Sequence, residues 1–204
     1  MDTPRSISQT SLFDEENKTP QNYRETFIEL VKQTRRDGVI DLLSYLDNET
    51  DFFIAPASTR FHGASPQGLV KHSLQVYYNL LTFKCLRDYS TDQLKIVGLF
   101  HDLCKANFYK SIMRNVKNEK TGKWEQIPSY TVSEQFPFGG HGSKSVFILS
   151  RFIKLSDEEA AAINCHMGGW DSTNYHNPST AFEKYPLAIC LHMADLMATY
   201  INKS

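Results

Sequence analysis

The sequence has no long uninterrupted apolar run and almost no excess of charge of either sign. Its most apolar stretch, YPLAICLHMADLMATYI, is interrupted by His192 and Asp195, so nowhere do 18 uncharged apolar residues follow one another. We therefore expect no membrane span. The 22 Lys and Arg residues nearly balance the 23 Asp and Glu residues, which leaves a net charge of −1. This balance excludes attraction of the whole surface to nucleic acid, and any contact with a polyanion must be local.

Cysteine is scarce, and CxxC pairs are absent. The four cysteines are Cys85, Cys104, Cys165 and Cys190. The opening MDTPRSISQT also lacks the charged and then apolar pattern of a secretory signal. We therefore expect reduced thiols and a cytoplasmic location.

Low-complexity tracts and internal repeats are missing as well. With 41% hydrophobic and 22% charged residues, the composition excludes a disordered, collagen-like or coiled-coil chain. The 204 residues are enough for one domain with its own core. Residues 1–20 are polar with few apolar anchors, so we expect a flexible N-terminal arm there and a single domain over residues 21–204.

Apolar residues at helical spacing run through most of the remaining chain. They predict two consecutive helices between Tyr23 and Leu46, with a break around Asp37 and Gly38. A further helix is expected over residues 141–152. Start signals mark the other helices: Ser65 as an N-cap before Pro66, and capping boxes of Ser90 with Gln93, Ser156 with Glu159 and Thr180 with Glu183. We expect the helix after Ser65 to reach about Arg87, and Pro186 to kink a last helix that continues to about Ile201.

One segment departs from the helical pattern. Residues 112–132, IMRNVKNEKTGKWEQIPSYTV, have β-branched and aromatic residues on both sides of a Lys-Thr-Gly-Lys turn. This pattern predicts a β-hairpin inserted at about residues 110–133. The expected fold is therefore mostly α, a helical bundle with its core over residues 60–202 and one inserted β-hairpin.

The histidines are the strongest chemical signal. All seven follow residue 60, and several lie on predicted apolar helix faces or at helix ends, where an unpartnered imidazole is costly to bury. His101 and Asp102 are adjacent, and Lys105 follows one turn later. Other members of the set, each on its own helix or helix end, are His72, His141, His166 and Asp195. Helices that converge in a bundle can aim such side chains at one point.

The stretches around these residues carry a family resemblance. His72 in GLVKHSLQV, the doublet in LFHDLCK and Asp195 in LHMADLMATY resemble the H…HD…D signature of the HD-domain metal-dependent phosphohydrolases. The resemblance covers roughly residues 60 to 200. His141 in FGGHGSKS and His166 in INCHMGGWD fall where two-metal members of that family place two further ligands. The fold implied is the HD-domain helical bundle.

The resemblance also implies which residues bind which metal ion. His72, His101 and Asp195 would hold one ion, His141 and His166 the other, and Asp102 would bridge them. Imidazoles and carboxylates suit divalent Mn, Fe, Co, Ni or Zn ions, with Mg also considered, and two such ions can share a hydroxide that attacks phosphorus. The implied catalytic residues are Asp102 and Lys105, the latter spaced to meet a phosphate.

Substrate-binding candidates lie on both sides of this set. The resemblance places Arg60 and His62 toward substrate, although both also suit surface and loop roles. Residues 105–123 hold six basic residues and one acid, so Lys110 and Arg114 could draw in an anion, while the lysines nearer the turn could simply be solvated. The hairpin aromatics Tyr109, Trp124 and Tyr130 could stack on a base or pack against the domain.

Other residues beside the motifs have competing interpretations. Asp171 and His176 could line the pocket mouth or cap their own loop. His192, one turn before Asp195, could be a ligand or the partner of a ligand, and the resemblance favours Asp195 as the ligand. Cys104 and Cys165 neighbour ligands in sequence but should point about 100° away from them on a helix, so we interpret both as core residues.

The function predicted is hydrolysis of a phosphate ester in a small anionic substrate, such as a nucleotide, a cyclic nucleotide or a short oligonucleotide. No extended nucleic-acid surface is expected. A deoxynucleoside triphosphate hydrolase or 5′-nucleotidase is the nearest alternative. Two other classes stay open: a di-iron oxygenase of the same fold, and a metal-stabilised binding module without turnover.

Overall fold

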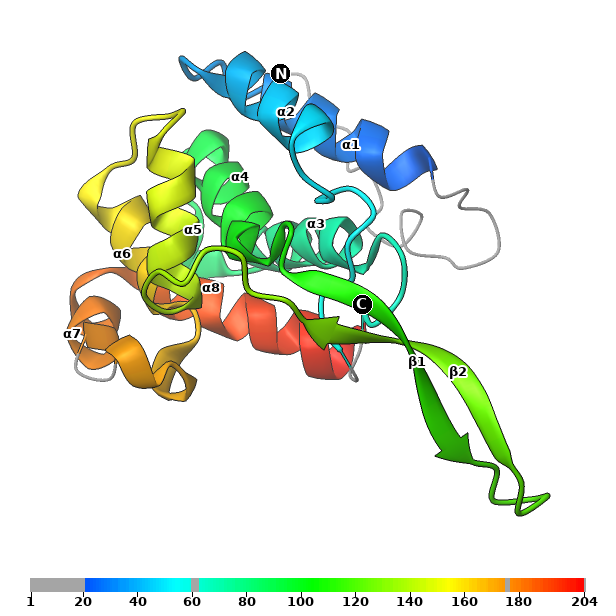
Figure 1. Ribbon diagram of the computed structural model, residues 1–204. Coiled ribbons are helices and arrows are strands. Elements are labelled where there is room, and N and C mark those ends of the chain that lie inside the picture. The colour runs from blue at the N-terminus through cyan, green and yellow to red at the C-terminus, as the bar shows by residue number, and fades with distance from the viewer. Residues whose placement is uncertain (1–20, 60–62, 175–176, 204) are drawn as a thin grey trace, which may run out of the picture.

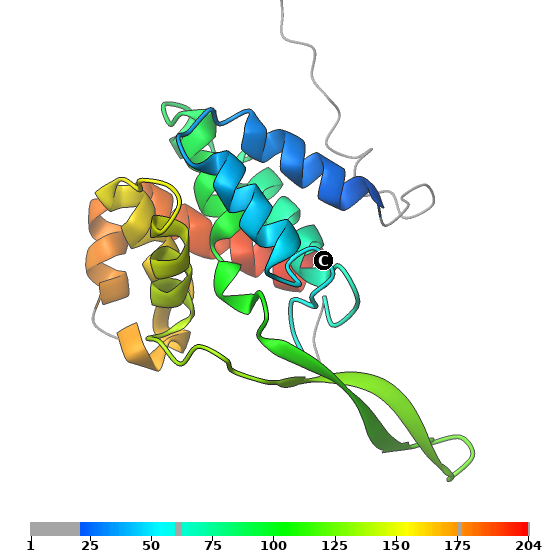
Figure 2. The ribbon, with the colours of Figure 1, turned by 45° about the horizontal axis from the view of Figure 1, so that its top comes forward.

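The computed structural model describes residues 21–59, 63–174 and 177–203. The arm predicted over residues 1–20 lies outside these ranges, as do Arg60, His62 and His176. Within the described residues, a helical body carries one β-hairpin that projects from it (Figures 1 and 2). The mostly α fold with one inserted hairpin is therefore confirmed.

Two groups of helices flank a central layer (Figure 1). In the centre, α3 packs against both α4 and α8, while α1 and α2 lie on one side and α5, α6 and α7 on the other. No helix in the described part of the chain is long and apolar enough to cross a membrane. The bounds are α1 Gln21–Lys32, α2 Val39–Asn48, α3 Gly68–Leu80, α4 Thr91–Phe100, β1 Tyr109–Lys117, β2 Trp124–Val132, α5 His141–Ser150, α6 Asp157–Cys165, α7 Asn177–Lys184 and α8 Pro186–Leu196.

Two predicted capping boxes begin helices as expected. Ser90 Oγ accepts a hydrogen bond from the amide of Gln93 at 3.2 Å, and α4 starts at the next residue. Ser156 Oγ accepts from the amide of Glu159 at 3.2 Å before α6. Each box satisfies amides that the first helical turn leaves without a partner. Because α4 and α6 lead into the HD doublet and into His166, these caps fix where two parts of the site begin.

The predicted start and end of α3 are wrong. The helix begins at Gly68 because Gln67 adopts a left-handed conformation with φ of 64°, and a side chain on Gly68 would overlap the carbonyl of Gly63. It ends at Leu80, well before Arg87. The Thr82 hydroxyl donates to the carbonyl oxygen of Asn79 at 2.7 Å, a local bond that competes with continuation of the helix.

The predicted last helix is two helices. Proline has no amide hydrogen to donate, so it is readily accommodated in the first turn of a helix but disrupts the interior. Pro186 accordingly begins α8, and α7 ends before it at Lys184 instead of continuing through a kink. The chain then passes from α8 into a π-helical turn at Met197–Ile201.

The core is aromatic under α1 and tightly packed between α3 and α4. The ring of Phe27 lies 5.0 Å from that of Phe52 and 5.4 Å from that of Phe100, and all three are fully buried. Gly98 lets α4 approach α3, since a Cβ there would lie 2.8 Å from Cα of Tyr77. This close approach places the end of α4, and with it His101, beside α3.

The hairpin pairs β1 with β2 in an antiparallel register that runs from Tyr109 opposite Val132 to Lys117 opposite Trp124. Its turn uses Gly122, whose φ of 71° suits glycine. At its base, the amide of Ser133 donates to the carbonyl oxygen of Phe108 at 2.8 Å. The hairpin predicted at about 110–133 is confirmed, and most of its residues are exposed.

Candidate metal centre

The residues that the sequence singled out come from four helices that meet at one point. His72 lies in α3, His101 and Asp102 directly follow α4, His166 directly follows α6, and Asp195 is near the end of α8. The side chain of Asp195 is 15% exposed, and the other four are almost fully buried. Burying imidazoles and carboxylates without partners costs free energy. Some interaction at this point must therefore offset that cost.

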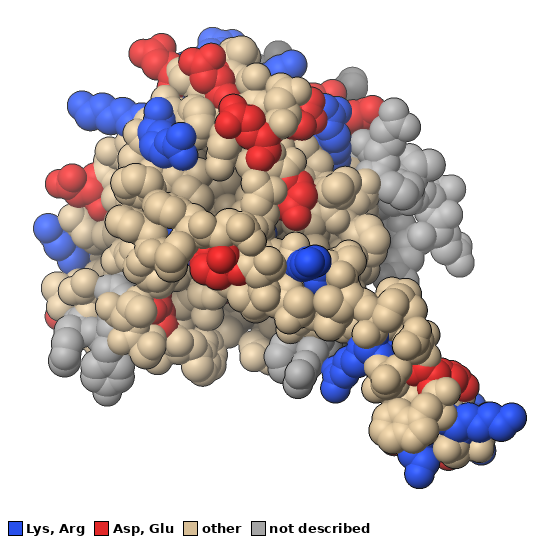
Figure 3. All heavy atoms as spheres, in the orientation of Figure 1, with Lys and Arg blue, Asp and Glu red and all other residues tan. Residues whose placement is uncertain are grey.

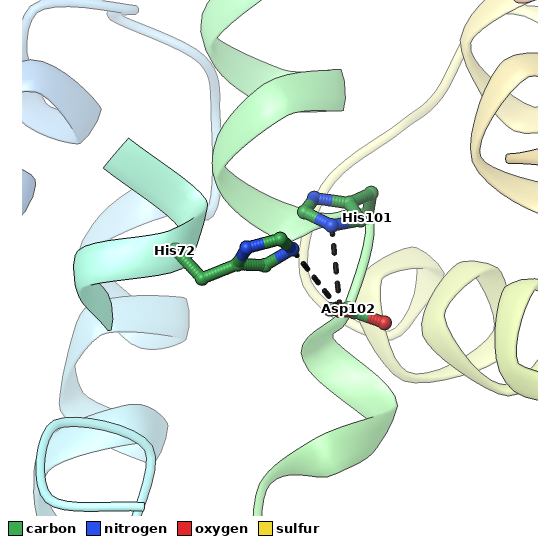
Figure 4. A group of neighbouring side chains, drawn as sticks. All are labelled: His72, His101 and Asp102. Atoms are coloured by element: carbon green, nitrogen blue, oxygen red, sulfur yellow. Dashed lines mark ion pairs between the residues drawn. The ribbon is translucent and has the colours of Figure 1, made fainter. Parts of the chain in front are cut away.

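Asp102 lies between two sets of imidazoles. Its Oδ2 is 3.7 Å from Nε2 of His72 and 3.4 Å from Nε2 of His101 (Figure 4). Its Oδ1 is 3.5 Å from Nε2 of His166. On the side of His72, Nε2 is also 3.0 Å from Oδ1 of Asp195. The two oxygens of one carboxylate thus serve different histidines, as in a carboxylate shared between two ions.

The backbone fixes the tautomer of two of these histidines. Nδ1 of His101 is 2.9 Å from the carbonyl oxygen of Gly98, and Nδ1 of His166 is 2.7 Å from that of Ile163. A carbonyl oxygen only accepts, so Nδ1 carries the proton in each ring and donates it. Each Nε2 therefore presents a lone pair to the centre, the form in which histidine binds a metal.

Three atoms of the cluster test whether a metal fits. Nε2 of His101, Nε2 of His166 and Oδ1 of Asp102 are buried and have no hydrogen-bond partner among the residues that the structure describes. Buried polar atoms are rarely left in this state, because each loses the hydrogen bonds that it made to water. A divalent cation would satisfy all three, and imidazole nitrogens with carboxylate oxygens suit first-row transition ions. The residues present therefore fit a metal.

Potential ligand atoms fall into overlapping groups, each within 4.8 Å. One group is His72, His101 and Asp102, and another is His101, His166 and Asp195. Asp102 also belongs to a third group with Cys104 and His141. With its 3.5 Å approach to His166, Asp102 therefore lies near all four histidines that the sequence predicted as ligands.

Lys105 is a partly buried cation of this centre, with its side chain 17% exposed. Its Nζ lies 2.7 Å from Oδ2 of Asp102. Burial alone raises the pKa of Asp102, but the charge of Lys105 lowers it well below its usual range. Burial lowers the pKa of Lys105, but the charge of Asp102 outweighs it and raises that pKa. Asp102 is therefore an anion and Lys105 a cation at neutral pH.

Asp195 is held as an anion in a similar way. Burial raises the pKa of this carboxyl, but the hydrogen bond and the charge of His72 lower it below its usual range. Two buried carboxylates in one cluster repel each other unless cations separate them. The centre is therefore matched to a positively charged occupant.

His141 enters the cluster from the first residue of α5. Its Nδ1 lies 3.2 Å from Sγ of Cys104, which orients the ring. Burial, together with the charge of Lys105, lowers the pKa of His141 against the opposing charge of Asp102, so the imidazole is neutral at pH 7. Burial also raises the pKa of the Cys104 thiol to about 12.

Cys104 is buried as predicted, but it also contacts a predicted ligand, which the sequence did not indicate. The prediction assumed an α-helix, but Leu103–Lys105 forms a 3₁₀ turn, in which side chains are spaced differently around the axis. The thiol therefore points at His141. Cys165, by contrast, is buried in the apolar core as predicted.

Small residues of α5 let this helix pack close to α6 and to the segment of Cys104, which places His141 at the cluster. A Cβ on Gly142 would overlap the carbonyl oxygen of Asn164 in α6. Ser145 Oγ accepts a hydrogen bond at 3.1 Å from the amide of Cys104. Both contacts tie α5 to the segments that carry the other ligands.

A pocket of about 350 Å³ opens beside the cluster. Lys105 and the cluster residues form its polar wall. Two aromatic residues are part of its lining but largely exposed, Trp170 at 65% and Tyr200 at 68%. Tyr200 belongs to the π-helical turn, a distortion that is frequent at functional sites. The rest of the lining is Ala57, Ser58, His72, His166, Met167, His192, Asp195, Leu196 and Thr199.

His192 forms a hydrogen bond with the backbone of His166, a predicted ligand. Its Nδ1 is 2.6 Å from the carbonyl oxygen of His166. Its ring stacks on Phe182 at 5.4 Å and lies 5.8 Å from the ring of Trp170. Gly168, with φ of 57°, makes room for it, because a Cβ there would lie 2.8 Å from the imidazole. Of the two roles that the sequence left open for His192, the structure therefore favours the partner of a ligand over the ligand itself.

Asp171 caps its own loop. Its Oδ1 accepts from the amide of Thr173 at 2.9 Å and from the Thr173 hydroxyl at 2.6 Å. A Cβ on Gly140, the residue before His141, would overlap the Asp171 carboxylate, so the loop of Asp171 packs against the start of α5. The charge of Asp171 opposes the lowering of the His141 pKa. No motif marked this contact, because it depends on how two loops pack.

The predicted substrate-binding residues are not all in one place. Lys105 lines the pocket. Lys110 and Arg114 are exposed on β1, and the described lining of the pocket includes neither. Arg60 and His62 lie outside the described ranges.

Comparison with known proteins bears on the whole of this site. A family model, the HD domain, matches residues 69–200, well over half of the chain. No curated protein and no solved structure matches the chain. The matched range contains all six predicted ligands.

Proposed function

Because the chain belongs to the HD domain family, we propose that it is a metal-dependent phosphohydrolase that cleaves a phosphate ester of a nucleotide, a cyclic nucleotide or a short oligonucleotide. The observation that carries this proposal is the Asp102 carboxylate, whose two oxygens face different histidines. It is supported by the unpartnered buried atoms of the same cluster. A pocket that ends on such a cluster and on a lysine suits a phosphate ester.

The proposed ligands form two sets around Asp102. His72, His101 and Asp195 would hold one divalent ion, while His141 and His166 would hold a second. When bound, such ions lower the pKa of a water molecule and neutralise charge on phosphoryl oxygens. Mn, Fe, Co, Ni, Zn and Mg are all candidates, and the ligand types favour the transition ions.

The residues of the chain supply the remaining chemistry. Lys105 is partly buried and cationic at the pocket wall, so it would bind a phosphoryl oxygen and stabilise the negative charge that grows there in an in-line displacement. Gly98 and Ile163 hold His101 and His166 by their Nδ1 protons, which keeps both rings in one orientation through turnover. Preorganised groups of this kind need no rearrangement as charge develops.

The shape of the pocket supports a substrate of nucleotide size. About 350 Å³ is at the lower end of the range for small-molecule sites. Its polar groups lie at the metal cluster, while Met167, Leu196 and the exposed ring of Trp170 line other parts. A phosphate at the cluster and a planar base against these side chains would use both regions.

The test is chromatography of a mixed pool after incubation with the Mn²⁺-loaded protein. The pool holds ribo- and deoxynucleoside triphosphates, cyclic mono- and dinucleotides and short oligonucleotides. Selective loss of one class would identify the substrate, and the product would show which bond is cut. A pool that survives intact would contradict the proposal and direct attention to iron content and oxygen-dependent activity.

The control for this test is Asp102→Ala, which removes the shared carboxylate. We expect the variant to lose metal, measured by inductively coupled plasma mass spectrometry, and to lose hydrolysis at least about 100-fold, since metal sites tolerate loss of a ligand poorly. Asp88→Ala, at an exposed acid, should change neither. Wild-type turnover by an Asp102→Ala protein without metal would disprove the assignment.

A further inference from the structure

The hairpin is a charged arm on a body of opposite charge. Between Tyr109 and Val132 it holds five Lys or Arg residues and two Glu residues, a net charge of +3. The whole chain is at −1, so the rest carries −4. Blue side chains are conspicuous on the projecting hairpin (Figure 3). A local basic arm on an acidic body attracts a polyanion to one place.

The two faces of this hairpin differ in chemistry. Residues that pair directly across an antiparallel ribbon share a face, and successive residues alternate between faces. The register places Tyr109, Met113 and Lys117 of β1 on the same face as Tyr130 and Trp124 of β2. Among the ten described residues of this face, Lys117 is the only charged one. We call it the aromatic face; its other members are Ser111, Asn115, Gln126, Pro128 and Val132.

The aromatic face begins at the pocket. The Tyr109 hydroxyl donates to the carbonyl oxygen of Ala57 at 3.3 Å, and Ala57 lines the pocket together with Lys105. The charge of Lys105 also acts on the Tyr109 hydroxyl, whose pKa burial raises to about 12. The face is therefore continuous with the wall where a phosphate would bind.

The aromatic face ends in open solvent. Trp124 is 71% exposed and Met113 57% exposed, and Lys117 lies directly opposite Trp124. Lys120 and Lys123 are exposed in the turn beside them. An exposed indole next to cations is the combination that single-stranded nucleic-acid sites use, with the ring stacking on a base and the lysines on phosphates.

We propose that the aromatic face of the hairpin binds a single-stranded oligonucleotide whose terminal phosphodiester lies at the metal centre. This inference rests on the proposed function, narrows its substrate to an oligonucleotide, and departs from the sequence expectation of no extended nucleic-acid surface. Eight residue steps of about 3.3 Å make the face about 26 Å long. At about 3.4 Å per stacked nucleotide, a strand of about eight nucleotides would run from the pocket to Trp124.

Direct binding tests the proposal without turnover. Fluorescence anisotropy of a 5′-fluorescein-labelled single-stranded octanucleotide is measured with the Asp102→Asn protein, and again after adding Trp124→Ala. Loss of one stacked base should weaken binding about 5- to 100-fold. The matched control, Ile40→Ala, removes another exposed apolar side chain and should leave the affinity unchanged.

A second variant keeps the test valid if Trp124→Ala fails to fold. Lys117→Gln should reduce the slope of log affinity against log salt concentration by about one, because one phosphate contact is lost. Lys84→Gln, an exposed lysine away from the hairpin, should leave the slope unchanged. Affinities and slopes that are the same in all variants would overturn the proposal and leave the hairpin as an arm for docking another protein.

Hydrolysis of bis(4-nitrophenyl) phosphate separates this proposal from the function on which it rests. This small diester reports on the metal centre without using the hairpin. If the wild-type protein cleaves this diester but the octanucleotide affinity is unchanged by substitution of Trp124 and Lys117, the hairpin proposal alone is wrong. If binding depends on both residues but no phosphate ester is cleaved, the hairpin site stands and the proposed hydrolysis is wrong.

Discussion

Lys105 and Asp102 show how single residues could separate metal binding from turnover. The ammonium lies 2.7 Å from the carboxylate that is the proposed bridging ligand. Without Lys105, Asp102 keeps its place at the end of α4 and loses a competing cation. The two residues should therefore affect different measurements when changed.

We expect Lys105→Ala to reduce the turnover number about 100-fold or more while the metal content stays at the wild-type level. The physical reason is that one preorganised charge that stabilises the phosphoryl oxygens is worth about 3–4 kcal/mol in the transition state. Steady-state kinetics and metal analysis of the same preparation check it. A large loss of metal would instead make Lys105 a structural part of the centre.

At the scale of elements, the position of α5 decides whether His141 joins the centre. Gly142→Ala would place a methyl group against the carbonyl of Asn164 in α6 and push the helices apart. We expect a loss of about 1–3 kcal/mol in the free energy of unfolding, as for other overpacked contacts. Metal content should also fall, because His141 moves with α5. Urea denaturation and metal analysis measure both, and a variant as stable as wild type would refute the close contact.

We expect the helical body to fold without the hairpin. Its ends are joined by the bond between Ser133 and Phe108, so residues 111–130 can be replaced by Asn-Gly, a two-residue turn that closes Lys110 onto Thr131. We expect the excised protein to melt within a few degrees of wild type and to keep its hydrolysis of bis(4-nitrophenyl) phosphate. Thermal denaturation and that assay test it, and an unfolded product would show that the hairpin supports the body.

Some local signals predicted their elements well, although the expected start at Ser65 was wrong and the box of Thr180 with Glu183 lies inside α7 instead of beginning a helix. The capping boxes at Ser90 and Ser156 and the glycine turn at Gly122 act within a few residues, so their sequence alone specifies them. The end of α3 and the break before Pro186 depend on which of several local bonds the packing favours, and both were misplaced.

The same distinction holds for the candidate metal centre: residues with local motifs were predicted, and contacts between distant segments were not. His72, His101, Asp102, His166 and Asp195 carry recognisable motifs, and the structure brings all of them together. The contacts of Cys104 with His141 and of Gly140 with Asp171 arise between segments distant in sequence. Side-chain direction in a 3₁₀ turn and the approach of two loops have no signature in a single sequence.

For the whole molecule, the cluster of unpartnered buried atoms predicts that metal stabilises the fold. An ion that binds only the native state raises stability by RT ln(1 + [L]/Kd), about 2.7 kcal/mol at a concentration 100 times Kd. We expect the melting temperature to rise with Mn²⁺ concentration and to fall after chelation. Differential scanning calorimetry measures it, and the Asp102→Ala protein should show no such rise. A wild-type melting temperature independent of metal would argue against binding.

The spread of the ligands along the chain also sets when an ion can be captured. The first proposed ligand is residue 72 and the last is residue 195, and they meet only after α8 has docked on α3 and α6. At about 5–20 residues per second, a ribosome needs roughly 6 to 25 seconds to pass from one to the other. A nascent or truncated chain that lacks α8 has no complete set of donors. If the proposed ligands hold the ions, binding of the complete metal set, and with it the proposed hydrolysis, would have to wait until Asp195 has been synthesised and α8 has docked.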